Sequence, residues 1–170
     1  MNRISIIQGD ITKIQVDAIV NAANSSLLGG GGVDGAIHQA AGIQLLEACR
    51  LLNGCKTGEA KITSGYNLQA KHVIHAVGPI WKGGNLRESQ LLASCYRNCF
   101  YLAKLNKMES IAFPNISTGV YGYPKAEAAN IVKNETLLFL ADNPKFKKVI
   151  FAIFDEENYH IYNRIFNQLN

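Results

Sequence analysis

The sequence lacks the long apolar runs and leader features that would send a chain into or across a membrane. Its longest apolar runs, such as residues 149–154, are far shorter than the ~20 residues that a membrane-spanning helix needs. The first residues, Met-Asn-Arg-Ile-Ser-Ile-Ile, contain neither the apolar core nor the cleavage site of a secretory leader. We therefore expect a cytoplasmic protein with no membrane partner.

Cysteine is scarce, and its spacing matches no zinc site. Without a secretory signal, we expect free thiols at all four positions, which are Cys49, Cys55, Cys95 and Cys99. Cys95 and Cys99 lie four residues apart in a predicted helix, and we interpret them as buried small apolar residues. His72 and His75 lie three apart on a predicted strand, so they point to opposite faces and form a poor metal pair. We predict no metal and no cofactor.

Motifs for nucleotide-dependent redox chemistry and for nucleic-acid binding are also missing. No Gly-x-Gly-x-x-Gly follows the first predicted strand, and no Gly-Lys-Ser/Thr marks a P-loop that would require Mg²⁺. The formal charge of +4 suits an anionic ligand. The only compact basic cluster, Lys145, Lys147 and Lys148, has no accompanying aromatic or Arg-rich stripe and is typical of a solvated loop. RNA binding is therefore allowed but unsupported.

Segments with strand and helix periodicity alternate along the chain. Predicted strands cover residues 4–7, 16–20, 61–65, 72–77, 110–113 and 148–154, and predicted helices cover residues 35–52, 86–106, 124–142 and 157–169. The pattern predicts one domain, residues 1–170, folded as a three-layer α/β/α sandwich with a central mixed sheet. Ligands of such sheets lie beyond the carboxyl ends of strands. That rule groups Asn21, Asn24, residues 115–122 and Asp155 at one edge.

The most informative segment is Asn-Ala-Ala-Asn-Ser-Ser-Leu-Leu-Gly-Gly-Gly-Gly-Val-Asp-Gly, residues 21–35. Four consecutive glycines cost conformational entropy and bury nothing, so we expect backbone that closely approaches a ligand. Free N–H groups that lead into a helix, here expected to begin near Gly35, bind anions and above all phosphate. Asp34 is either the N-cap of that helix or a group that acts on the bound ligand. A second segment of this kind, Ser-Thr-Gly-Val-Tyr-Gly at residues 117–122, precedes the helix expected near Pro124.

Five blocks of the chain, in order, resemble macrodomains of the MacroD type. The blocks are residues 9–12, 21–35, 57–63, 75–79 and 117–122. This family binds ADP-ribose and cleaves it from carboxylate or acetyl esters. The resemblance implies the macrodomain fold and a hydrolase whose partners are ADP-ribose, O-acetyl-ADP-ribose and mono-ADP-ribosylated proteins. Two alternatives stay open: a reader module that binds ADP-ribose without cleaving it, and a regulatory role through RNA or a partner protein.

The resemblance also implies a role for each site residue. Asp10 and Ile11 would bind adenine, with Phe154 as a wall beside the base. Asn24 and Asp34 would face the distal ribose as the catalytic pair, with Asp34 orienting or activating water. The other implied ligand-binding residues belong to the two glycine-containing loops and are Asn21, Gly30, Gly31, Gly32, Val33, Ser117, Thr118, Gly119, Val120 and Tyr121.

Purely structural interpretations stand beside these roles. Asp10 is also suited to cap a turn, Asn24 to form an Asx turn, Phe154 to end a core strand, and Tyr121 to lie exposed in a turn.

His38 lies one helical turn after Asp34, on the same side, and either takes part in the chemistry or braces the loop. Two residues depart from the family pattern, because Gln39 and Asn115 stand where Arg and Ala are expected. We interpret Trp81 as a packing residue.

Overall fold

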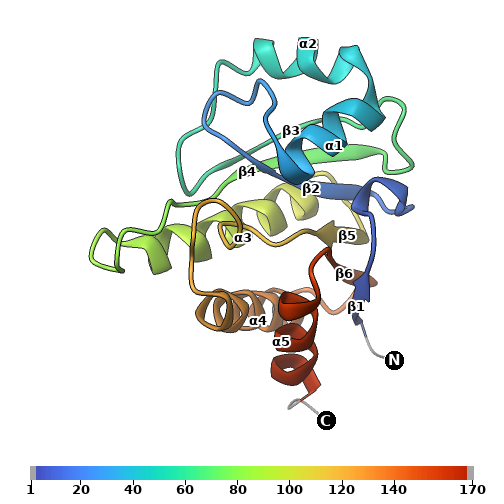
Figure 1. Cartoon of the computed structure of the whole chain (residues 1–170). Helices are drawn as coiled ribbons and strands as arrows, with labels where there is room; N and C mark the ends of the chain where they lie inside the picture. Colours follow the sequence, from blue (N-terminus) through green and yellow to red (C-terminus); the bar gives the residue numbers. More distant parts are fainter. Residues whose placement is uncertain (1–2, 168–170) are drawn as a thin grey trace.

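The computed structural model describes residues 3–167 as a six-stranded mixed sheet between two layers of helices (Figure 1). The strands are β1 (Ile4–Gln8), β2 (Ala18–Ala23), β3 (Ala60–Ser64), β4 (His72–Val77), β5 (Ser110–Phe113) and β6 (Lys148–Ile153). The helices are α1 (Gly32–Ala41), α2 (Ile43–Leu51), α3 (Glu88–Leu105), α4 (Lys125–Asp142) and α5 (Glu156–Asn167), with a short 3-10 helix η1 at Ile11–Lys13. The predicted α/β/α sandwich with a mixed sheet is confirmed.

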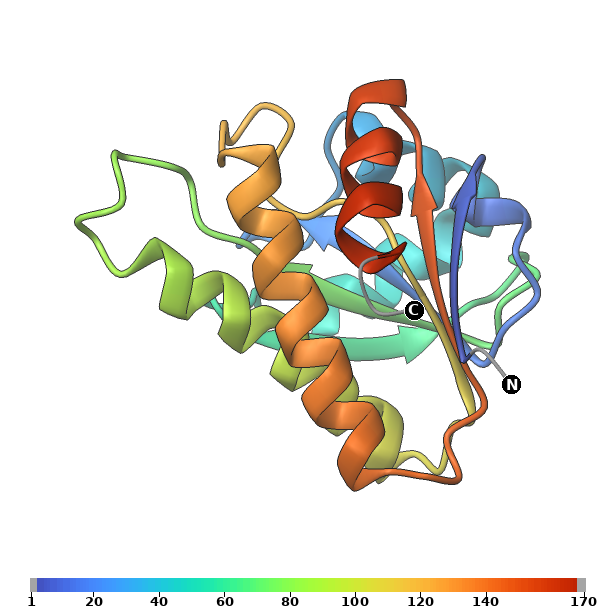
Figure 2. The same ribbon diagram turned by 90° about the horizontal axis from the view of Figure 1, so that it is seen from below.

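The strand order β1-β6-β5-β2-β4-β3 brings distant parts of the chain together. Every neighbouring pair is parallel except β3 and β4, which are antiparallel. The carboxyl ends of β1, β2, β5 and β6 therefore meet at one edge of the sheet. Helices α3, α4 and α5 pack side by side over one face, as Figure 2 shows from below, and α1 and α2 cover the other.

Two predicted boundaries are wrong in an informative way. The helix expected over residues 35–52 begins at Gly32 and is broken into α1 and α2 at Gly42, whose φ of 88° belongs to the left-handed region. Strand β2 continues to Ala23, so Asn21 lies within the strand instead of after it. The last helix ends at Asn167, and the predicted positions 168 and 169 lie outside the described residues.

Each face of the sheet carries its own core. The face under α3, α4 and α5 is rich in packed aromatic rings, including Phe100, Phe113 and Phe151. The face under α1 and α2 is smaller and mainly aliphatic. All four cysteines are free, as predicted, and all four are buried, whereas burial was predicted only for Cys95 and Cys99. Burial raises the pKa of the Cys95 thiol to about 12. Among residues 3–167, no helix is long and apolar enough to cross a membrane.

Asp17 fastens the amino ends of three neighbouring strands. Its carboxylate accepts hydrogen bonds from Lys71 Nζ (2.8 Å), from the Glu109 backbone N–H (2.9 Å) and from the Ser110 N–H and hydroxyl (3.1 Å each). Partial burial works to raise the pKa of Asp17, but these hydrogen bonds outweigh it and lower the pKa to about 2. The native state thus favours the ionised carboxylate.

We expect Asp17→Asn to lower the free energy of unfolding by about 1–2 kcal/mol at pH 7. Because the native pKa is depressed, this stability is present above the unfolded-state value near 4 and is lost as pH falls towards 2. Urea unfolding of both proteins at pH 7 and pH 3 measures the difference, which should narrow at pH 3. An equal difference in unfolding free energy between the two proteins at pH 7 and pH 3 would contradict a depressed pKa for Asp17.

Candidate functional site

A cavity of about 870 Å³ opens at the edge where the parallel strands end. Its walls come from the segments that follow β1, β2, β4, β5 and β6 and from the first turn of α1. A cavity of this size accommodates a ligand as large as a dinucleotide fragment. Of the site residues predicted from the sequence, Asn21 alone does not line the cavity. Those that line it are Asp10, Ile11, Asn24, Gly30, Gly31, Gly32, Val33, Asp34, Ser117, Thr118, Gly119, Val120, Tyr121 and Phe154.

One end of the cavity combines an acid with an exposed aromatic ring. Asp10 caps η1, and its Oδ1 accepts hydrogen bonds from the backbone N–H (2.9 Å) and hydroxyl (2.7 Å) of Thr12. These bonds hold the pKa of Asp10 below its usual range. The capping interpretation therefore holds, while the carboxylate also lines the cavity. Phe154 is 89% exposed just after β6, so its interpretation as a core residue is wrong.

The glycine-rich loop runs directly into the first turn of α1, which begins at Gly32, earlier than expected. Gly31 is the N-cap, and no side chain caps the helix, so the N-cap interpretation of Asp34 is wrong. The loop passes close to the two predicted catalytic side chains. A Cβ on Gly30 would lie 3.0 Å from Asp34 Oδ2 and 3.4 Å from Asn24 Nδ2. Glycine at this position therefore keeps both polar groups accessible from the cavity.

Asp34 projects from α1 into the cavity although it is only 5% exposed. Its Oδ1 accepts a hydrogen bond of 2.8 Å from Asn21 Nδ2, which comes from within β2. His38 Nε2 lies 3.4 Å from the same oxygen, without the alignment of a hydrogen bond. Because Asn21 is fully buried and does not line the cavity, it lies behind Asp34 and supports it. His38 also lies outside the lining, which agrees with the bracing interpretation.

Asn24 is held within its own loop. Its Nδ2 donates to the Gly29 carbonyl (2.9 Å), and its Oδ1 accepts from the N–H (3.1 Å) and hydroxyl (2.6 Å) of Ser26. The Asx-turn interpretation is therefore confirmed. The Asn24 side chain also lines the cavity, and the second N–H of its Nδ2 remains available to a ligand. The turn therefore fixes the orientation of the amide without using all of its hydrogen-bond donors.

The second loop is also shaped for close approach of the backbone. Ser117 has a left-handed φ of 67°, and a Cβ on Gly78 would lie 2.2 Å from the Ser117 hydroxyl. The Trp81 N–H donates to the Tyr121 carbonyl (2.8 Å), which ties this loop to the segment after β4. Trp81 packs against Tyr123 with ring centroids 4.7 Å apart, as the packing interpretation predicted.

Lys125, Asp155 and Asn158 also line the cavity. Asp155 was expected at this edge from the sequence, whereas Lys125 and Asn158 were not expected to bind a ligand. Lys125 is the single Lys or Arg in the described lining. Its Nζ forms an ion pair with Glu157 and lies 3.9 Å from Asp155 Oδ1. Its position directly after Pro124, at the start of α4, was the available signal. Asn158 Nδ2 donates a hydrogen bond of 2.8 Å to Asp155 Oδ2. Asn158 lies inside the first turn of α5, where no sequence motif marks it as a residue of the cavity.

The charges around the cavity favour binding of an anion by backbone instead of by side chains. Asp10, Asp34 and Asp155 supply three carboxylates against the one cation of Lys125, which is itself paired. The N-termini of α1 and α4 meet the cavity beside the two glycine-containing loops. Backbone N–H groups and helix dipoles at such ends stabilise phosphate. In residues 3–167, no group of three or more His, Cys, Asp or Glu side chains is placed to hold a metal ion.

Of the two family departures, Asn115 belongs to this lining and Gln39 does not. Gln39 is exposed on α1, so the chain has no arginine brace at that position. Asn115 lines the cavity, but its buried Nδ2 has no hydrogen-bond partner among the described residues.

Comparison with known proteins gives one consistent family. The family model described as Macro domain matches residues 20–132. A macro domain-containing protein of Mesorhizobium japonicum is 57% identical over 164 residues, which cover 96% of this chain and 93% of the relative. A Salmonella typhimurium protein named O-acetyl-ADP-ribose deacetylase is 53% identical over 171 residues, covering 98% of this chain and 96% of the relative.

Solved structures agree with this fold. The Oceanobacillus iheyensis macrodomain with ADP superposes with a TM-score of 0.92 at 49% identity, covering 96% of this chain and 90% of the other. The Trypanosoma brucei macrodomain in complex with ADP-ribose has a TM-score of 0.91 at 45% identity, covering 95% of this chain and 68% of the other.

The tight turn between Gly30 and Gly35 gives a stability test. A Cβ on Gly35 would lie 2.6 Å from the Gly30 carbonyl oxygen, which belongs to backbone and cannot easily move. We expect Gly35→Ala to lower the free energy of unfolding by about 1–3 kcal/mol, although alanine gains about 1 kcal/mol of helix propensity. Denaturant unfolding measures the change.

Gly119→Ala is the matched control, because a Cβ at Gly119 meets nothing within 4 Å. Its stability should stay within about 0.5 kcal/mol of the original protein. Equal stability of the two variants would show that the backbone at Gly35 can accommodate a Cβ beside the Gly30 carbonyl oxygen.

Proposed function

The chain belongs to the Macro domain family, and we propose that it is a hydrolase that binds ADP-ribose and cleaves esters at the distal ribose. The substrates proposed are O-acetyl-ADP-ribose and proteins that carry ADP-ribose on Glu or Asp. One observation supports this most directly. The Asp34 carboxylate is nearly buried, is fixed by Asn21 at 2.8 Å, and still lines a cavity of about 870 Å³.

In this proposal, each part of ADP-ribose occupies its own part of the cavity. Adenine lies between Asp10 and the exposed ring of Phe154, where the Asp10 carboxylate accepts from the exocyclic amine. The diphosphate lies between the two glycine-containing loops and receives N–H groups from residues 30–33 and 117–121. The distal ribose then reaches Asn24 and Asp34, with Tyr121 against it. The proposal is supported by the fact that all these residues line one continuous cavity.

Hydrolysis of the acetyl ester follows from this placement. Asp34 accepts a proton from a water molecule as the water oxygen attacks the ester carbonyl carbon. The tetrahedral intermediate collapses, the bond to the ribose oxygen breaks, and the proton passes to that oxygen. The products are acetate and ADP-ribose. For a Glu or Asp adduct, water cleaves the link between C1″ and the carboxylate in the same position. Binding in the cavity supplies much of the rate, because it holds ester and water in line.

The alternative is a reader module that binds ADP-ribose without cleaving it. The two proposals share every binding contact and differ only at Asp34 and Asn24. A reader has no need for a carboxylate held by a buried amide, so the contact from Asn21 to Asp34 favours the hydrolase. The cytoplasmic location expected from the sequence stays a prediction.

We expect Asp34→Ala to lose about 10²-fold or more in the rate of ester cleavage, the usual scale of acid–base catalysis. Binding of ADP-ribose should persist, because the diphosphate and adenine contacts come from other residues. The measurement is release of acetate from O-acetyl-ADP-ribose, and of ADP-ribose from a protein modified on Glu, alongside calorimetric binding of ADP-ribose. Binding without release by the original protein would support the reader, and equal release by the variant would remove Asp34 from the mechanism.

Phe154→Ala should weaken ADP-ribose binding by roughly 5–150-fold, since base–aromatic stacking contributes about 1–3 kcal/mol. Stability should stay within about 0.5 kcal/mol, because the ring is 89% exposed and supports no core packing. Titration calorimetry measures the affinity. The control is Tyr101→Ala, which removes a ring that is 62% exposed on α3 and outside the cavity. An unchanged affinity for Phe154→Ala would exclude stacking.

A further inference from the structure

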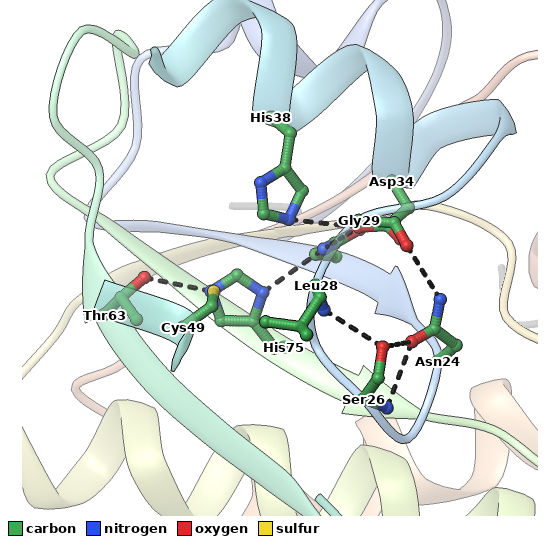
Figure 3. A network of polar contacts seen from close by, with 10 residues as sticks. Asn24, Ser26, Leu28, Gly29, Asp34, His38, Cys49, Thr63 and His75 are labelled. Atoms are coloured by element: carbon green, nitrogen blue, oxygen red, sulfur yellow. Dashed lines mark hydrogen bonds and ion pairs between the residues drawn. The ribbon is translucent and has the colours of Figure 1, made fainter. Parts of the chain in front are cut away.

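Three buried polar side chains, Thr63, His75 and Asn21, form a line across β3, β4 and β2 that leads to Asp34. Figure 3 shows Thr63, His75 and Asp34 from close by. Asn21 and His75 are register partners in the parallel pair β2 and β4, and both are 0% exposed. The alternate positions of these strands on the same face are apolar, namely Ile19, Ala23, Val73 and Val77. Polar groups in such a layer are costly unless hydrogen-bonded, so their bonds decide what they do.

The Asn21 amide uses both its N–H groups in different directions. Its Nδ2 lies 2.8 Å from Asp34 Oδ1 and 3.2 Å from His75 Nδ1. Its Oδ1 is buried and has no hydrogen-bond partner among the described residues. A flipped amide would place that oxygen against the Asp34 carboxylate, which repels it. The observed orientation is therefore the one that serves the carboxylate.

His75 can accept a hydrogen bond from the second N–H of Asn21 only if its Nδ1 is unprotonated. Its proton must then reside on Nε2, which lies 2.9 Å from the Thr63 hydroxyl oxygen and 3.6 Å from Cys49 Sγ. The N–H at Nε2 therefore donates to Thr63, and the tautomer is fixed from both sides. An apolar residue at position 75 would fill the space but leave the second amide N–H unpaired.

The surroundings keep this imidazole neutral. Burial lowers the pKa of His75 to about 3, with a smaller contribution from the nearby His38. The titratable groups that face it are Asp34 and His38 from α1 and Cys49 from α2, beside Thr63 from β3. A protonated ring would present an N–H to the amide N–H of Asn21 and break the contact. Neutral His75 is thus the form compatible with the observed Asn21 orientation.

We propose that His75 is a positioning residue that acts through Asn21: by accepting one amide N–H, it holds the other on the catalytic carboxylate of Asp34. This inference rests on the proposed function, because it requires that Asp34 take part in ester hydrolysis. His75 itself does not line the cavity and touches no substrate. Its effect is expected in the catalytic step and not in binding of ADP-ribose.

Nitrogen NMR of the unmodified protein tests the hydrogen-bond arrangement without any variant. Two-bond ¹H–¹⁵N correlation distinguishes the two neutral tautomers of each histidine ring. We expect His75 to carry its proton on Nε2, with Nδ1 bare, at pH 7 and at pH 5. A proton on Nδ1 at pH 7, whether in the other tautomer or in the charged ring, would overturn the proposal. This result is independent of whether the protein has hydrolase activity.

A pair of variants separates positioning from packing. His75→Asn places an amide oxygen near the position of Nδ1 and loses the Thr63 contact, whereas His75→Gln reaches towards Thr63 and removes the Nδ1 acceptor. Both variants bury one carboxamide, so they match in polarity. We expect kcat for ester hydrolysis to stay within about 3-fold in His75→Asn and to fall at least about 10-fold in His75→Gln, the scale of one hydrogen bond to a charged group. The dissociation constant of ADP-ribose should stay within about 2-fold in both.

The outcomes distinguish this inference from the proposed function. No turnover by the original protein would reject the hydrolase, while the NMR result would still decide the His75 tautomer. Turnover by the original protein with equal kcat losses in the two variants would reject the positioning role alone. A loss of ADP-ribose affinity that parallels the loss of kcat would assign His75 a general structural role and would also overturn the proposal.

Discussion

The hydrogen bond from Asn21 to Asp34 joins the middle of the sheet to the first turn of α1, and the geometry of the cavity depends on it. Its length of 2.8 Å fixes a carboxylate that would otherwise turn towards bulk water. The glycine-rich loop can then run past Asp34 at contact distance, because Gly30 has no Cβ to obstruct it. The sheet, the helix and the loop are thereby locked to one another at the point where the chemistry is proposed.

The cavity separates charge recognition from catalysis. Its charged side chains are mostly acidic, so an anionic ligand depends on backbone N–H groups and on the ends of α1 and α4. Such groups are fixed in direction and need no counter-ion to be displaced when a ligand binds. The carboxylates are then free for other tasks: Asp10 at the end proposed for adenine, and Asp34 at the end proposed for the distal ribose.

Most of the fold and more than half of the lining residues were predictable, because the patterns that encode them are local. Alternating apolar segments gave the strands and helices, and glycine-rich segments at strand ends gave the two loops. The helix start at Gly32 and the break at Gly42 were missed, since glycine disfavours helix on average but adopts either hand where packing demands it. Lys125 and Asn158 were missed because their place in the lining depends on how α4 and α5 dock against the loops.

The sequence by itself determined the order of elements, the family resemblance and the chemical types of the residues that surround the cavity. It also limited His72 and His75 to opposite faces of one strand, because side chains alternate along a strand. Only the tertiary structure decided that Asn21 lies behind Asp34 and not beside a ligand, and that His75 completes the line behind it. Those contacts join residues 13 and 54 positions apart, and such distances close only when β2, β4 and α1 pack together. No local pattern contains that information, because it depends on strand register and helix docking.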